Sequence, residues 1–154
     1  MIAQIAALIA VLGAGVVYGT DVFCALVLRP ALARVDDAAL TAVVGNVHRF
    51  GDRRMPLPGI LGLLGALVAS VFAALGGRPP ASICAGVAFV LLMVWLVLYL
   101  RISAPINRAL TAAADRNQAL PNARELQDAW DQVITPRAVL QGLAVVALCA
   151  SLIS

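Results

Sequence analysis

The chain has 154 residues, of which 62% are hydrophobic and 12% are charged, and its formal net charge is +3. Together with a mean hydropathy of +0.97, this lies far from the roughly half-apolar, quarter-charged balance of soluble domains and excludes an ordinary water-soluble globular protein. The sequence predicts an integral membrane protein with one domain, residues 1–154, whose helices pack against one another in lipid.

Four apolar segments each approach the ~20 residues that an α-helix needs to cross a ~30 Å hydrocarbon layer. The predicted spans are residues 2–28, 57–75, 81–100 and 133–153. Between the second and third spans, the stretch Gly-Gly-Arg-Pro-Pro predicts a compact turn and hence an antiparallel hairpin. The predicted fold class is therefore all-α, an integral membrane four-helix bundle.

The arginines indicate an orientation in the membrane. Ten of the eleven lie in the two long connections or at the ends of the spans, and only Arg78 lies in the hairpin turn. The positive-inside rule then places both long connections in the cytoplasm and both termini outside the cell membrane. The first residues lack the basic region of a secretory signal peptide, so we expect the first apolar segment to be a true span.

Both long connections are predicted to form amphipathic cytoplasmic helices, at the inner membrane surface or over the bundle mouth. In residues 36–49, Asp36 or Asp37 can cap a helix whose apolar residues follow helical spacing. Residues 122–137 also have one apolar face and should run straight into the fourth span. Pro136 is expected to kink that junction, because proline removes a backbone donor and clashes with the preceding turn.

Asp21 is a carboxylate inside the first span. It shares a helical face with Tyr18, whereas Gly15 and Gly19 form a small-residue motif on another face, suited to close helix contact inside the bundle or with a second copy. An ionised carboxylate facing lipid costs several kcal/mol, so Asp21 should face the interior and be paired, protonated or hydrated. Arg137 is its leading predicted partner, and Asp21 either fixes helix register in this pair or has a direct functional role.

His48, the only histidine, lies at the inner mouth of the second span. It is either a proton carrier near neutral pH or an interfacial histidine beside arginines. Asp52 is expected to form local surface pairs with Arg49 and Arg53. Where the third span ends, Trp95 and Tyr99 lie four residues apart on one face, as membrane-belt aromatics or as walls of an apolar pocket for a flat ligand.

The sequence contains no metal, flavin or nucleotide motif, so the cofactors remain unknown. With one histidine and three isolated cysteines, the chain lacks the spacing of zinc, haem or iron–sulfur sites. Cys84 and Cys149 lie at similar depth, where a disulfide is geometrically possible and burial as separate apolar thiols is the simpler interpretation. Because topology accounts for the arginines, no nucleic-acid partner is predicted.

Several short motifs together resemble the anthrone oxygenase-like family of small four-helix bacterial and fungal membrane proteins. They are the segment YGTDVFCALVLRPAL, an Asn-Arg pair after Pro105, and a Trp and an Arg seven residues apart leading into the last span. The resemblance implies oxidation of an anthrone to an anthraquinone by molecular oxygen, without a recognised metal or flavin site. Many members have a histidine three residues before the last arginine, where this chain has Ile134. The positions that match the family are Gly19, Pro30, Asn107, Trp130 and Arg137.

Two functions are compatible with these features. In the first, a cofactor-independent oxygenase admits a flat phenolic or quinol-like lipophilic substrate from the bilayer. Arg137 and Asn107 stabilise a phenolate, and Asp21 or His48 accepts the proton. The candidate substrate-binding residues are Tyr18, Trp95, Tyr99, Asn107, Arg108 and Trp130. In the second, the protein is a non-enzymatic accessory, assembly or transport subunit that contacts a membrane-complex partner or a second copy through Gly15 and Gly19.

Overall fold

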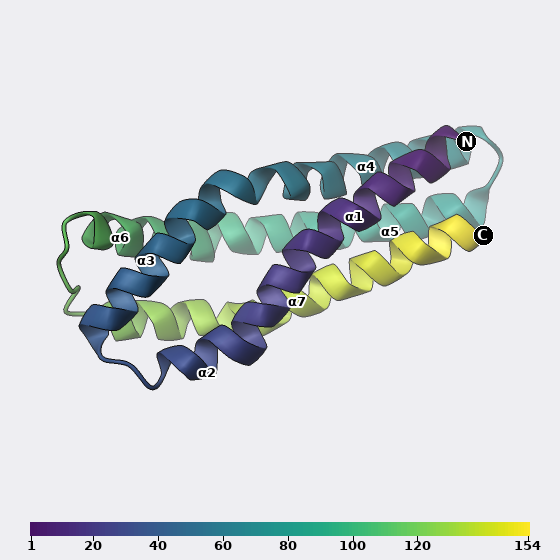
Figure 1. Cartoon of the computed structure of the whole chain (residues 1–154). Coiled ribbons are helices and arrows are strands. Elements are labelled where there is room, and N and C mark those ends of the chain that lie inside the picture. The colour runs from purple at the N-terminus through teal and green to yellow at the C-terminus, as the bar shows by residue number, and fades with distance from the viewer.

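The computed structural model describes all 154 residues and contains helices and no strands (Figure 1), which confirms the predicted all-α class. The elements are α1 (Ile2–Phe23), the π-helical turn η1 (Cys24–Leu28), α2 (Arg29–Leu32), α3 (Asp37–Arg54), α4 (Pro56–Leu75), α5 (Pro79–Leu98), the π-helical turn η2 (Tyr99–Ser103), α6 (Ala104–Asp115) and α7 (Ala123–Ile153).

Four continuous helices are long and apolar enough to cross a membrane, as expected for a membrane-embedded protein. They are Ile2–Leu32, Pro56–Leu75, Pro79–Asp115 and Ala123–Ile153. Each contains the whole of one predicted span, and the third and fourth helices extend well beyond theirs. The predicted spans end where the hydrophobicity falls. The helices continue past these points because charged side chains do not interrupt the backbone hydrogen bonds of a helix.

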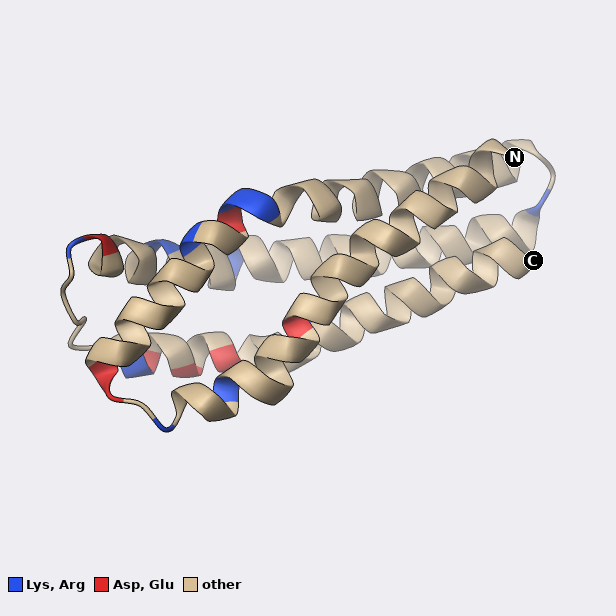
Figure 2. Cartoon of the chain, in the orientation of Figure 1, with Lys and Arg blue, Asp and Glu red and all other residues tan.

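The bundle has two different ends. Both chain termini and the α4–α5 turn lie at one end, which we call the hairpin end, and α2, α3 and α6 lie at the other (Figure 1). Nearly all the charged residues gather toward that second end, here called the charged end, while Arg78 lies in the hairpin turn (Figure 2). This distribution is the one from which the sequence predicts cytoplasmic connections.

Toward the hairpin end, small residues bring α1 and α4 into close contact. A Cβ atom at Gly13 would lie 2.6 Å from Pro58 O and 2.7 Å from Gly62 N, and one at Gly65 would lie 2.9 Å from Ala6 O. Only glycine allows the two backbones to approach so closely. The buried core of this half continues with small side chains and two leucines: Ala10, Ala14, Ala66, Ala88, Leu92, Ala144 and Leu148.

Gly15 and Gly19 do not make such a contact within the chain. No atom lies within 4 Å of a Cβ placed at either residue. The spacing of Gly15 and Gly19 identifies a smooth helix surface, but α4 packs against a different face of α1. The contact face contains Gly13, which is two residues and about 200° away from Gly15. Of the two predicted uses of this motif, the contact inside the bundle is therefore wrong.

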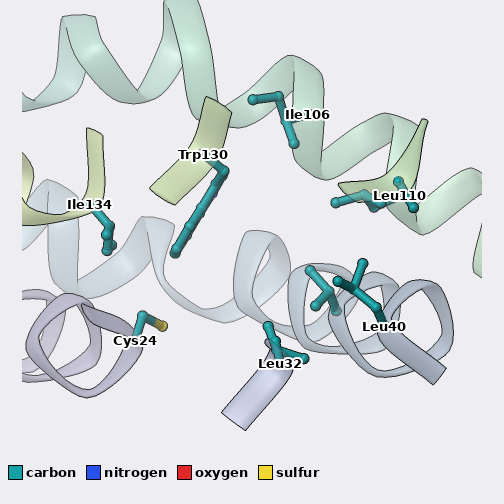
Figure 3. Packing of buried hydrophobic residues seen from close by; sticks show 9 residues of the cluster. Cys24, Leu32, Leu40, Ile106, Leu110, Trp130 and Ile134 are labelled. Atoms are coloured by element: carbon teal, nitrogen blue, oxygen red, sulfur yellow. The ribbon is translucent and has the colours of Figure 1, made fainter. Parts of the chain in front are cut away.

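Toward the charged end, larger side chains fill the core between α2, α3, α6 and the first half of α7 (Figure 3). The cluster consists of Cys24, Leu32, Leu40, Val44, Ile106, Leu110, Ala123, Trp130 and Ile134. Its helices need wider spacing than those packed through alanine and glycine. The charged half is therefore held apart by side chains, which leaves space for the cavity described below.

Polar contacts hold the α2–α3 corner in place. Asp36 caps α3, because its Oδ1 accepts a hydrogen bond from Ala39 N at 2.7 Å, and this confirms one of the two predicted caps. Arg124, from the start of α7, donates to Leu32 O at 3.0 Å and to Val35 O at 2.8 Å. These contacts dock the corner on α7, which supports α3 over the end of the bundle.

The second connection runs straight into the fourth span, as predicted, since α7 is one helix from Ala123 to Ile153. Pro136 lies inside α7 without ending it. The three cysteines are free thiols. Only Cys24 is buried, so the expected burial of Cys84 and Cys149 is wrong: Cys84 is half-buried and Cys149 is exposed.

Candidate functional site

A cavity of about 380 Å³ lies in the charged half. Residues of α1, η1, α3, α4, α5, η2, α6 and α7 line it. This volume falls in the range of small-molecule pockets, about 300–1,000 Å³. Most of the wall is apolar, and it includes Val17, Val44, Ile60, Leu63 and Leu96. The polar wall residues are Thr20, Asp21, His48, Asp52, Asn107, Gln127 and Arg137.

One side of the cavity contains the predicted pair of Asp21 and Arg137, which is confirmed. Arg137 Nη2 donates to Asp21 Oδ1 at 2.9 Å, and the two side chains are only 6% and 5% exposed. Arg137 Nη1 donates to Ser103 Oγ at 2.7 Å, and Gln141 Nε2 donates to Asp21 Oδ2 at 2.6 Å. Both carboxylate oxygens are occupied, so the charge is compensated at this depth, and this favours the register-fixing role of Asp21.

Aromatic rings surround this pair. The Arg137 guanidinium carbon lies 5.6 Å from the ring centroid of Tyr99 and 5.7 Å from that of Trp130, within cation–π range. The ring of Trp95 stacks on that of Tyr99 with centroids 6.3 Å apart. Trp95 Nε1 lies close to the Asp21 carboxylate without making a hydrogen bond. Trp95 is buried and lines the cavity, so it is a pocket wall rather than a belt aromatic.

A second polar network lies on the α3 side. Asp52 Oδ1 accepts hydrogen bonds from Tyr99 Oη at 2.8 Å and from Asn107 Nδ2 at 2.9 Å. Asn107 Oδ1 in turn accepts one from Trp130 Nε1 at 3.1 Å. Four side chains from α3, η2, α6 and α7 are thus joined in one chain of hydrogen bonds along the cavity wall.

The predicted surface pairs of Asp52 with Arg49 and Arg53 are therefore wrong. Arg49 instead makes an ion pair with Asp115 on α6, and Arg53 is exposed. Arg53 is turned about 100° away from Asp52 around α3, whereas Arg49 lies only about 60° away but pairs with α6 instead. Sequence proximity suggested partners within α3, whereas the carboxylate that pairs with Arg49 comes from another helix.

His48 lies on the same face of α3 as Asp52, one turn earlier. The residue is 7% exposed, and its ring centroid lies 5.5 Å from that of Trp130, so its side chain points into the bundle. Burial lowers the pKa of His48 to about 4; Asp52 opposes that shift and Arg137 adds to it. The imidazole is therefore neutral at pH 7. The four-residue spacing of His48 and Asp52 was the signal in the sequence that could have identified Asp52.

Four residues that line the cavity each have one buried polar atom without a hydrogen-bond partner: His48 Nε2, Trp95 Nε1, Gln127 Oε1 and Arg137 Nε. The fifth such atom in the chain, Gln141 Oε1, is not on the cavity wall. Buried polar groups are almost always paired, and each unpaired one costs about 1–3 kcal/mol. Four of the five such atoms in the chain thus belong to residues of one cavity wall.

Seven of the nine candidate site residues line this cavity: Asp21, His48, Trp95, Tyr99, Asn107, Trp130 and Arg137. The other two, Tyr18 and Arg108, do not. Tyr18 packs against α7, where a Cβ atom at Gly142 would lie 3.0 Å from its ring, and Arg108 is exposed. Ile134, at the position where many family members have histidine, is fully buried in the core and is not part of the wall. Besides Asp52, the structure adds Gln127 to the predicted set.

No group of three or more His, Cys, Asp and Glu side chains lies close enough together to hold a metal ion. No protein-family model matches the chain, and no curated protein or solved structure matches it either.

Proposed function

We propose that the protein binds a flat, lipophilic phenol or quinol in the cavity and, as the resemblance to the anthrone oxygenase-like family implies, oxidises it with molecular oxygen. The observation that supports this most is the set of four unpaired buried polar atoms around one largely apolar cavity. An apolar space with a few convergent polar groups is typical of a small-molecule site.

The walls suit a planar aromatic ligand. Trp95, Tyr99 and Trp130 all line the cavity, and aromatic faces stack well on flat ring systems. Ile60 and Leu100 line the cavity and are also 53% and 55% exposed on the surface. A lipophilic ligand can therefore reach the site from the bilayer between α4 and η2.

The unpaired atoms also indicate oxygen substituents on the ligand. Trp95 Nε1 and Arg137 Nε can only donate hydrogen bonds, whereas Gln127 Oε1 can only accept them. Arg137 and Gln127 are ten residues apart on α7, about 15 Å along the helix axis at 1.5 Å per residue. A ligand that satisfies both ends must carry an acceptor toward Arg137 and a donor toward Gln127, as a hydroxylated ring system does.

The proposed chemistry uses the ligand's own reactivity. Loss of the hydroxyl proton makes the ring electron-rich enough to react directly with oxygen, and the guanidinium of Arg137 favours the resulting anion in an apolar cavity. In the anthrone case, a ring CH₂ becomes a carbonyl: one atom of O₂ forms the C=O group, and the other leaves with both hydrogens as water.

Ligand binding can be followed by tryptophan fluorescence, because the chain has two tryptophans and both line the cavity. We expect 2-naphthol to quench the emission of the purified protein saturably. Gly59→Leu should abolish this quenching, because Gly59 lines the cavity beside Trp95. A Cβ atom placed at Gly59 would lie 3.4 Å from the Trp95 ring, so a leucine side chain there fills the space of the ligand. Gly15→Leu, in open space on α1, is the matched control.

Unsaturable quenching, or equal quenching in Gly59→Leu and the wild type, would contradict the binding site. Oxygen consumption with an anthrone then tests turnover: binding without any oxygen uptake would limit the proposal to a binding protein.

The second candidate, an accessory subunit, is favoured by a different observation. Gly15 and Gly19 leave an open smooth surface on α1 with no atom of this chain opposite. If that surface holds a second copy or a partner subunit, Gly19→Leu should disperse the assembly in crosslinking or light-scattering measurements and leave 2-naphthol binding intact. A monomer in the wild type, with ligand bound, would remove this candidate in its self-assembling form.

A further inference from the structure

We infer that Asp52 recognises the ligand's hydroxyl group, accepting its hydrogen bond through Oδ2. The inference rests on the proposed function, since it needs the cavity to bind a phenolic ligand. It goes further because it names the residue that distinguishes a hydroxylated ligand from one without a hydroxyl group. From the sequence alone, this residue was expected only to form surface ion pairs.

Two carboxylates line the cavity, and they differ in which of their oxygens accept hydrogen bonds within the chain. Asp21 has Arg137 on one oxygen and Gln141 on the other, so each of its oxygens already accepts a hydrogen bond within the chain. Asp52 takes part in none of the chain's ion pairs, and its only hydrogen bonds reach Oδ1. Oδ2 is thus the one oxygen of these two carboxylates that accepts no hydrogen bond within the chain.

The carboxylate of Asp52 is held in a fixed orientation. Two donors, Tyr99 Oη at 2.8 Å and Asn107 Nδ2 at 2.9 Å, converge on Oδ1. Asn107 is itself oriented by Trp130 Nε1. Rotation of the carboxylate would break both bonds at once, so Oδ2 is held ready without a reorganisation cost when a ligand binds.

The neighbours of Asp52 define what it can recognise. His48, one helical turn earlier, is buried against Trp130, lines the same cavity and has an unpaired Nε2. A ligand ring stacked on these aromatics can place its hydroxyl at the α3 wall. Because Asp52 offers a charged acceptor, a ligand that lacks the donor leaves it unpaired, and sites of this kind reject such analogues strongly.

A pair of probes tests the inference: 2-naphthol and its methyl ether, 2-methoxynaphthalene, which has the same rings and no donor. Wild-type protein should bind 2-naphthol at least about tenfold more tightly, the effect of one hydrogen bond to a charged group. In Asp52→Asn, Oδ1 can keep both of its hydrogen bonds while the free acceptor becomes an N–H donor. The preference should then fall to within about twofold, with affinity for the ether unchanged.

Asp128→Asn is the matched control, since Asp128 is exposed and lies off this cavity, and it should keep the full preference. Equal affinity of the wild type for both probes would overturn the inference while leaving the proposed binding site in place; binding of neither probe would instead refute the proposed function. A preserved preference in Asp52→Asn also overturns the inference. If that variant does not fold, Asp52→Ser, which removes the carboxylate without added volume, must show the same loss.

Discussion

The two halves of the bundle hold their helices together by different means. In the hairpin half, α1 and α4 approach through Gly13, Gly62 and Gly65 until a single added Cβ atom would meet backbone. In the charged half, large side chains keep the helices apart, and a buried ion pair and a hydrogen-bond network line a cavity. The close packing of the hairpin half therefore fixes the positions of the helices, and the charged half can keep a polar cavity between them.

The largest expected effect lies in the charged half. Asp21→Asn or Arg137→Gln alone should destabilise the protein by about 4 kcal/mol, because each leaves a charge buried without its partner. The double variant should cost clearly less than the sum of the two. Thermal unfolding in detergent measures this, with Arg49→Gln as control, since its partner Asp115 is 53% exposed and that pair should contribute about 1 kcal/mol or less. Simple additivity of the two single changes would show that the pair does not hold this half together.

The hairpin half should respond most to added volume. Gly13→Ala places a methyl group against Pro58 O and the backbone of Gly62, neither of which can move without shifting α4. We expect a loss of about 3 kcal/mol, at the upper end of overpacking effects. Gly15→Ala, two residues away in open space, should change the melting temperature very little. Similar melting temperatures for the two variants would show that α1 and α4 are not packed as closely as the comparison requires.

Acid should weaken the charged half through His48. The pKa of His48 is about 4 in the folded protein, against an ordinary value of 6.5. Between these values the unfolded chain binds a proton that the folded protein does not, so stability falls as the pH drops below about 6.5 and levels off below about 4. The loss at pH 5 should be about 2 kcal/mol. Melting temperatures of the wild type and His48→Gln between pH 7 and pH 5 test this, and an equally steep decline in both would assign the sensitivity to other groups.

The smallest effect concerns the one reciprocal hydrogen-bonded pair between α4 and α5. Ser70 Oγ donates to Ser82 O at 2.9 Å, and Ser82 Oγ donates to Ser70 O at 3.0 Å. Ser70→Ala should cost only about 0.6 kcal/mol, as is usual for hydrogen bonds between membrane helices. Ser151→Ala is the control, because Ser151 Oγ bonds only to Leu148 O within α7. A loss of several kcal/mol at Ser70 would mean that polar contacts, rather than close packing, also hold the hairpin half.

Some features of the site were accessible from the sequence. The pairing of Asp21 with Arg137 followed from cost alone, since a carboxylate at that depth needs a cation that enters the bundle at the same level. Trp95 and Tyr99 were recognised as possible pocket walls because their spacing places them on one helical face. Asp52 was missed, although its spacing from His48 places the two on the same face, because neighbouring arginines offered a nearer explanation.

Other features had no readable signal. The small-residue motif at Gly15 and Gly19 marks a smooth surface, but the contact with α4 is made by Gly13, and a motif does not state which face another helix will occupy. Gln141 donates a hydrogen bond to the second oxygen of Asp21 and lies one turn beyond Arg137. It becomes a candidate partner only after Asp21 and Arg137 are known to pair.

The sequence by itself determined that this chain is a helical membrane protein, because the free energy of burying a segment in lipid depends on residues that are adjacent in the chain. The same local reasoning supplied the four spans, the cap of α3 and the need for a partner at Asp21. Only the tertiary structure decided which carboxylate pairs with an arginine and which one has an oxygen without a hydrogen bond. The physical reason is that hydrogen-bond partners and cavities are made by side chains from several helices, and their relative rotation and spacing are set by packing contacts far apart in the sequence.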